Sequence, residues 1–137
     1  MKEDELTMYE MKDEYKTNID IIDKQHKHLF EITDRTYELL TNDLLVDKYD
    51  KILELLDELK EYTLLHFSTE ERYMKEINYK NLEAQKEAHA QFIKKLDDYN
   101  LNTIDDNQDE SIRDLLEFLN SWLVNHIINM DKQIGEA

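Results

Sequence analysis

Apolar residues recur at intervals of three and four in four long stretches of the chain, at residues 19–41, 47–77, 80–99 and 108–132. This repeat places the apolar side chains on one face of an α-helix, so each stretch predicts an amphipathic helix. Residues 1–18 are mostly polar and predict a loosely packed N-terminal arm. Residues 100–109 are polar and predict a loop. Short connections favour antiparallel neighbours, and the pattern predicts an all-α, up-down-up-down four-helix bundle that forms one domain over residues 19–137.

The composition agrees with an all-helical domain and excludes several kinds of protein. The 137 residues include one glycine and no proline, so the chain lacks the turn residues that a β-rich fold needs. The absence of cysteine excludes disulfides, thiolate metal sites and iron–sulfur clusters. A formal net charge of -16 disfavours nucleic acid and anionic membranes as partners. With no secretory signal and no long apolar run, we expect a cytoplasmic protein, and we expect it to be a monomer.

Ionisable residues interrupt the apolar faces of all four predicted helices. A histidine occupies each face, and two carboxylates follow at short spacing: His26, His66, His89 and His126, with Glu70 and Asp131. Burying such groups without partners costs several kcal/mol or more, about the whole stability of many domains. In an antiparallel bundle all six residues fall at one end and at about the same depth. The pattern therefore predicts a pair of metal ions and not six isolated core residues.

The residue types and their spacing suit first-row metal ions such as iron, zinc or manganese. His66 and Glu70 are one helical turn apart and can point at one centre. His126 and Asp131 are five apart, about 140° around an ideal helix. Asp131 must therefore reach sideways, or the helix must loosen near its end. His28 is turned about 200° away from His26, which predicts a surface residue.

Other residues near the predicted site have plainer interpretations. Phe30 and Phe67 are expected to shield the metals from water or simply to fill the core, and Trp122 is expected to lie beside the site. Glu71 lies off the apolar face, so we expect its side chain to be solvated.

Four segments together resemble the hemerythrin family, in particular its bacterial single-domain members. They are DKQHKHLF at 23–30, YTLLHFSTEERYM at 62–74, HAQF at 89–92, and FLNSWLVNHI at 118–127 with Asp131. The resemblance covers roughly residues 9–133. It implies two non-haem iron ions, joined by an oxo or hydroxo bridge, that bind O2 reversibly. It also implies that His26 and His66 hold one iron, that His89, His126 and one further residue hold the other, and that Glu70 and Asp131 bridge them.

The sequence departs from the family pattern at Gln85, where a third histidine ligand is usual. Gln85 could ligate through its oxygen, water could fill the position, or the second iron could bind weakly and leave a mononuclear or mixed-metal site. A core glutamine hydrogen-bonded to a neighbour is the remaining interpretation. In the arm, Met11 replaces a usual tryptophan and Asn18 a usual glycine.

Three functions follow from this reading. The first is reversible O2 binding for storage, delivery or sensing, without enzymatic activity. The second is a peroxidase or oxidase with a di-iron or mixed-metal site that exploits the incomplete ligand set at Gln85. The third is a sensing module whose metal controls a partner.

Overall fold

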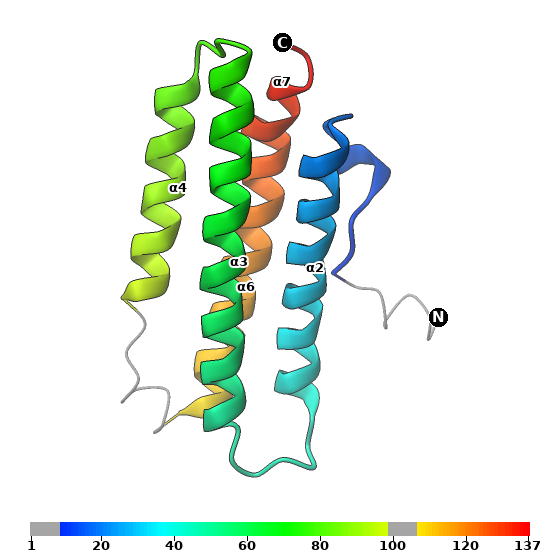
Figure 1. The fold of residues 1–137 in the computed structure, drawn as a ribbon. Helices are drawn as coiled ribbons and strands as arrows, with labels where there is room; N and C mark the ends of the chain where they lie inside the picture. Colours follow the sequence, from blue (N-terminus) through cyan, green and yellow to red (C-terminus); the bar gives the residue numbers. More distant parts are fainter. Residues whose placement is uncertain (1–8, 99–106) are drawn as a thin grey trace.

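The computed structural model describes residues 9–98 and 107–137, and these residues form a bundle of antiparallel helices (Figure 1). The four long helices are α2 (Asp20–Thr41), α3 (Tyr49–Glu76), α4 (Leu82–Asp97) and α6 (Gln108–His126). A short 3-10 turn, η1 (Asp13–Tyr15), precedes them, and a π-helical turn, η2 (Ile127–Asp131), and α7 (Lys132–Ile134) follow. No strand occurs in this part of the chain. The predicted all-α bundle is confirmed.

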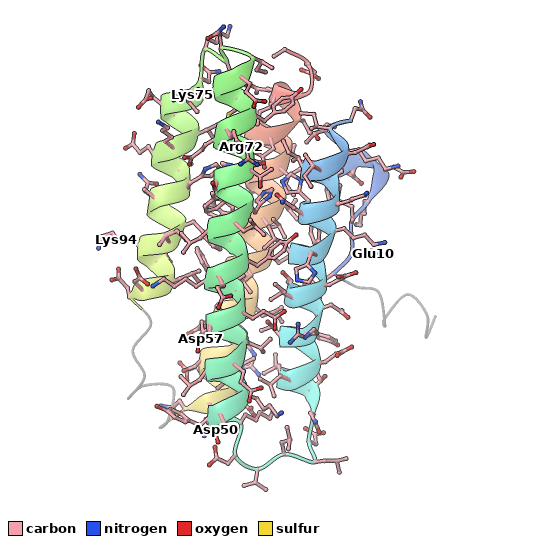
Figure 2. The ribbon with its side chains drawn as sticks, in the orientation of Figure 1. Glu10, Asp50, Asp57, Arg72, Lys75 and Lys94 are labelled. Carbon is pink, nitrogen blue, oxygen red and sulfur yellow. The ribbon has the colours of Figure 1, made fainter. Side chains whose placement is uncertain are left out.

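Helix α2 packs against α3 and α6, and α3 packs against α4. Apolar side chains from these faces form the core, while charged residues such as Lys94 on α4 project outward (Figure 2). The predicted apolar faces are largely correct, since Ile22, Leu59 and Leu119 are all buried. Ile77 is an exception: it follows the last residue of α3 and is 38% exposed.

Both ends of α2, α3 and α4 and the start of α6 lie within two residues of the predicted bounds. The helix predicted at 108–132 is not continuous, because α6 ends at His126 and the π turn η2 separates it from α7. Asn78 ends α3 in the left-handed conformation, with φ of 53°, and the Tyr79 N–H donates to the Met74 carbonyl oxygen across this turn. Asparagine tolerates this conformation better than most residues, so it closes the helix where glycine is common. The predicted loop ran from residue 100 to residue 109. Tyr99 and residues 100–106 lie outside the described residues, and Gln108 and Asp109 belong to α6.

The expectation of a loosely packed arm is wrong for Tyr15 and Thr17, which are buried. The Tyr15 ring stacks on Phe30 with centroids 5.4 Å apart. Thr17 donates two hydrogen bonds of 2.8 Å to Asp23 Oδ1, one from its backbone N–H and one from its hydroxyl. Asn18, with φ of 68°, makes the turn between Thr17 and the start of α2. The division of the chain into an arm at residues 1–18 and one bundle domain at residues 19–137 stays a prediction.

The only glycine of the chain lies where the C-terminal turn meets the segment before α2. A Cβ atom on Gly135 would stand 1.8 Å from the Thr17 carbonyl oxygen, which is well inside van der Waals contact. Lys132 Nζ also donates to the Glu14 carbonyl oxygen at 2.7 Å. The C-terminal turn therefore packs directly on the N-terminal segment. Among the described residues, no helix is both long and apolar enough to cross a membrane.

Candidate metal centre

The six ionisable residues singled out from the apolar faces all meet inside the bundle. They come from the first half of α2, the second half of α3, the middle of α4 and the end of α6 with η2, and each is at most 7% exposed: His26, His66, Glu70, His89, His126 and Asp131. Antiparallel packing brings these helix segments to the same end of the molecule (Figure 1). The predicted convergence at one level is confirmed, whereas their role as ligands stays a proposal.

The six residues form two groups that share both carboxylates. One group is His26, His66, Glu70 and Asp131, and the other is Glu70, His89, His126 and Asp131. Within each group the potential ligand atoms lie within 4.8 Å of one another. Such an arrangement offers four donors to each of two neighbouring cations and is consistent with a binuclear metal site.

Each shared carboxylate turns one oxygen toward each group. Glu70 Oε2 lies 3.3 Å from His26 Nε2 and 3.4 Å from His66 Nε2, while Glu70 Oε1 lies 3.2 Å from His89 Nε2. Asp131 Oδ2 lies 3.0 Å from His26 Nε2, and Asp131 Oδ1 lies 3.1 Å from His126 Nε2. The two oxygens of one carboxylate therefore face different groups, which is the geometry of a carboxylate bridge.

The π-helical turn η2 brings Asp131 to the centre. A π-helix hydrogen-bonds each N–H to the carbonyl five residues earlier, so it is wider than an α-helix and places i and i+5 on one face. The Lys132 N–H makes this bond to the Ile127 carbonyl oxygen. Of the two ways in which Asp131 could reach the centre, loosening of the helix end is the one that the structure shows.

Two residues outside the six hold the imidazole rings in place. Gln25 Oε1 accepts a hydrogen bond of 2.8 Å from His66 Nδ1, and Gln25 Nε2 donates to Thr69 Oγ1. Glu71 Oε2 accepts a hydrogen bond of 2.8 Å from His89 Nδ1. Each contact keeps the proton on Nδ1 and leaves Nε2 free to face the interior, as outer partners of metal-bound histidines do.

Sequence reasoning did not identify these two residues. Glu71 was expected to be solvated, and this is wrong, because its side chain is only 29% exposed and contacts His89. Gln25 is 41 residues from His66 in the sequence, so no local spacing links the two. Glu71 directly follows Glu70, but only the position of α4 shows that it reaches another helix.

Gln85, the departure from the family pattern, lies inside the cluster and is 1% exposed. Its Nε2 donates to Asp131 Oδ1 at 3.0 Å, and its Oε1 lies 2.9 Å from His126 Nε2. The described structure therefore shows a buried, hydrogen-bonded glutamine among the potential ligands.

Aromatic rings cover the second group from the side. The Phe67 ring stacks on His89 with centroids 3.8 Å apart, and the Trp122 ring stacks on His126 at 4.4 Å. Phe67 also lines a surface groove between α3 and α4. Phe30 is buried too, but it stacks on Tyr15 and does not line the cavity next to the cluster.

A small cavity of about 10 Å³ lies inside the bundle, next to Phe67 and Trp122 and about one helical turn along from the cluster histidines. A cavity of this volume is about large enough to hold one water-sized molecule. Most of its wall comes from residues three or seven positions from a cluster histidine on the same helix: Leu29, Thr33, Leu59, Thr63, Phe92, Leu119 and Leu123. The Thr33 and Thr63 hydroxyls donate to carbonyls of their own helices, so the wall is apolar in effect.

The cluster contains ionisable atoms that lack partners of their own. His26 Nε2, His89 Nε2 and both oxygens of Glu70 are buried and make no hydrogen bond of good geometry, although they lie close together. Orphaned groups of this kind are rare in folded proteins and call for an explanation such as a bound ion. Imidazole nitrogens and carboxylate oxygens are the donors that divalent iron accepts, so the residues present fit a metal pair.

The charges in the cluster stabilise one another in the metal-free protein. Burial opposes the charged form of His26, but the carboxylates of Asp131 and Glu70 outweigh it and raise the His26 pKa to about 9. Burial likewise opposes ionisation of Glu70, yet the charge of His66 and contacts with His26 and His89 hold the Glu70 pKa well below its usual value. A cation entering the site must displace the His26 proton.

His28 lies outside the cluster, as expected. Its side chain is 38% exposed, and its nitrogens lie near Glu31 and Glu58.

Comparison with known proteins agrees with the geometry. A family model described as Hemerythrin HHE cation binding domain matches residues 17–137. Bacteriohemerythrin of Clostridium acetobutylicum is 46% identical over 126 residues, covering 92% of this chain and 98% of that protein. Bacteriohemerythrin of Pseudomonas aeruginosa is 32% identical over 126 residues, with 91% and 78% covered. Bacteriohemerythrin of Methylococcus capsulatus is 29% identical over 122 residues, covering 89% of this chain and 89% of that protein.

The matched region contains all four helices and every member of the buried cluster. With a family model over most of its length, and a relative that it covers almost in full, this chain belongs to the hemerythrin family.

Proposed function

We propose that this protein binds O2 reversibly at a non-haem di-iron centre. The proposed ligands of the two ions are the members of the buried cluster: His26, His66, Glu70, His89, His126 and Asp131. The observation that carries the proposal is the pair of four-donor groups that share Glu70 and Asp131. The names of the relatives, bacteriohemerythrins, agree with it.

Two ferrous ions held here would supply the electrons that reversible O2 binding requires. The protein's own task is to hold the donors in position and to keep water out. Glu71 and Gln25 fix the rings of His89 and His66 with Nε2 turned inward. The two carboxylates would supply two negative charges, which would offset part of the charge of the ions in this buried region.

The surroundings of the cluster favour a small, weakly polar ligand. The adjoining cavity is apolar and has space for about one molecule of the size of water. Phe67 and Trp122 lie against the imidazole rings and limit access from the side. All six donor side chains are at most 7% exposed, so a large substrate would meet little of their surface directly.

This environment favours gas binding over an enzyme that acts on large organic molecules. Peroxide is small enough to enter, so peroxidase activity is the second candidate, and the donor set around Gln85 is the observation that favours it. A metal-controlled sensing role uses the same centre and differs only in its partner. We also propose that this protein is a monomer in the cytoplasm.

The test starts from metal-free protein loaded with Fe²⁺ under anaerobic conditions. We expect two iron ions per chain and a visible absorption band that appears with O2 and disappears when argon removes the gas. Repeated cycles should return the band with little loss. Bound iron near zero, or a band that argon does not reverse, contradicts the proposal.

Two variants make the test specific. Glu70→Gln removes one proposed bridge and should abolish the O2-dependent band. His28→Leu changes a histidine outside the cluster and should leave the iron content and the band unchanged. Steady consumption of peroxide by the loaded protein, lost in Glu70→Gln, would instead support the peroxidase.

A further inference from the structure

Gln85 is inserted between two potential ligands on one side of the cluster. It lies on α4, one helical turn before His89, and its side chain is buried. The amide nitrogen donates to Asp131 Oδ1 at 3.0 Å, and the amide oxygen accepts from His126 Nε2 at 2.9 Å. Asp131 and His126 both belong to the group that includes Glu70 and His89. Both ends of the Gln85 amide therefore touch atoms that a cation on this side would use.

A cation on this side would leave the Gln85 oxygen without its hydrogen-bond donor. A metal-bound histidine uses the lone pair of its ligating nitrogen for the ion, and that nitrogen carries no proton. His126 Nε2 could then no longer donate to Gln85 Oε1, and His126 is the only partner that Oε1 has among the described residues. A buried carbonyl oxygen without a donor is unfavourable, so the cation becomes the partner within reach.

The spacing of the atoms already suits this change. Two ligand atoms at right angles and roughly 2.1 Å from one ion are about 3 Å apart. Gln85 Oε1 and His126 Nε2 are 2.9 Å apart, and His126 Nε2 and Asp131 Oδ1 are 3.1 Å apart. Meanwhile the Gln85 amide nitrogen can keep its hydrogen bond to Asp131 and hold the oxygen in place.

We propose that Gln85 Oε1 is a fifth protein ligand on the His89–His126 side, an inference that rests on the two-metal centre proposed above. That side then offers two imidazole nitrogens and three oxygens, whereas the His26–His66 side offers two nitrogens and two oxygens. Carboxylate and carbonyl oxygens suit Mn²⁺, and imidazole suits Zn²⁺. The Gln85 side is therefore an oxygen-rich position that admits Mn²⁺, and the centre can hold two different ions.

The experiment is a competition between Mn²⁺ and Zn²⁺ for the metal-free protein. Wild type, Gln85→Leu and Gln85→His are equilibrated anaerobically with both ions at matched free concentrations, and the bound ions are counted per chain. Gln85→Leu removes an oxygen donor and Gln85→His replaces it with an imidazole. We expect the bound Mn²⁺ to Zn²⁺ ratio to fall about tenfold or more in both variants.

The exposed glutamine of α7 provides the matched control. Gln133→His adds an imidazole away from the cluster and should leave the ratio unchanged. Circular dichroism of the metal-free variants shows whether each one folds, and Gln85→His decides the matter if Gln85→Leu does not fold. A crystal structure of the Mn²⁺-loaded wild type should place Gln85 Oε1 at about 2.2 Å from an ion.

The outcomes separate this inference from the proposed function. Two ions per chain with the same Mn²⁺ to Zn²⁺ ratio in the wild type and the folded variants would overturn the role of Gln85 and leave the di-iron proposal standing. Failure of the wild type to take up a second ion of any kind, Fe²⁺ included, would overturn the two-metal centre itself.

Discussion

Glu71 accepts a hydrogen bond of 2.8 Å from the Nδ1 of His89, and this contact joins α3 to α4 at the edge of the buried cluster. The carboxylate holds the ring with Nε2 facing Glu70 and makes the imidazole a better donor to a cation. Burial opposes the charged form of His89, but Glu70 and Glu71 outweigh it and raise its pKa in the metal-free protein. One glutamate of the adjacent pair faces the interior of the cluster, and the other supports His89, a proposed ligand.

Substitution Glu71→Gln should weaken metal binding while leaving the fold intact. An amide accepts the hydrogen bond but carries no charge, so the affinity of the His89 side is expected to fall about tenfold. Competition with a chelator of known affinity measures the change. Glu76→Gln, on an exposed position of the same helix, is the control. Equal affinities for the wild type and Glu71→Gln would mean that the contact only packs the two helices.

The stability of the metal-free protein should fall as the pH rises from about 6.5 to about 9. The pKa of His26 is about 9 in the folded state, against 6.5 for an ordinary histidine. The folded state therefore binds this proton more tightly, and the resulting stabilisation is complete below about pH 6.5 and lost as the pH rises through about 9. Glu70, whose pKa is lowered, adds stability above its ordinary value of 4.5 that is lost in acid.

Urea unfolding of the metal-free protein at a series of pH values measures this dependence. His26→Leu should flatten the slope between pH 6.5 and 9, whereas His28→Leu should not. In the presence of metal ions the trend reverses, since binding displaces protons and grows stronger as the pH rises. Metal-free wild type that becomes more stable across this interval would contradict the assignment.

Substitution Phe67→Leu should open the cluster to water from the groove between α3 and α4. The Phe67 ring stacks on His89 and lines both this groove and the inner cavity. A leucine covers less of the imidazole, so we expect the O2-dependent absorption to decay several-fold faster and the stability to fall by about 1–2 kcal/mol. Stopped-flow and long-term absorption measurements follow the decay.

The control is Phe118→Leu, because Phe118 stacks on Phe92 but contacts no cluster histidine through its ring. Faster decay in both variants would point to a general loosening of the core. An unchanged decay in Phe67→Leu would show that water reaches the site by another route.

Substitution Gly135→Ala should destabilise the protein although the residue is exposed. The added methyl group would meet the Thr17 carbonyl oxygen at 1.8 Å, and a backbone atom cannot move away as a flexible side chain can. Overpacking of this kind costs about 1–3 kcal/mol. Chemical unfolding of the variant measures the loss, with the neighbouring Glu136→Ala as the control. A midpoint equal to that of the wild type would show that the C-terminal turn and the N-terminal segment separate easily.

The sequence by itself determined the helices and the convergence of the ionisable residues. Steps of three and four place His66 and Glu70 on one helical face, and antiparallel order then brings His26 and His126 to the same end. Both inferences rest on the periodicity within each helix and on the short connections between helices. Both of these features can be read directly from the spacing of residues along the chain. Gln85 was singled out from the resemblance to the hemerythrin family, because it stands where a third histidine ligand is usual.

Only the tertiary structure decided the contacts between helices that local periodicity does not encode. Glu71 meets His89 across 18 residues of sequence, and Gln25 meets His66 across 41. The packing of Gly135 on Thr17 and the π turn that aims Asp131 likewise depend on how far one helix lies from its neighbour. A helix presents each side chain in a predictable direction, but what that side chain contacts depends on the rotation and distance of the next helix, and these are set by packing of the whole core.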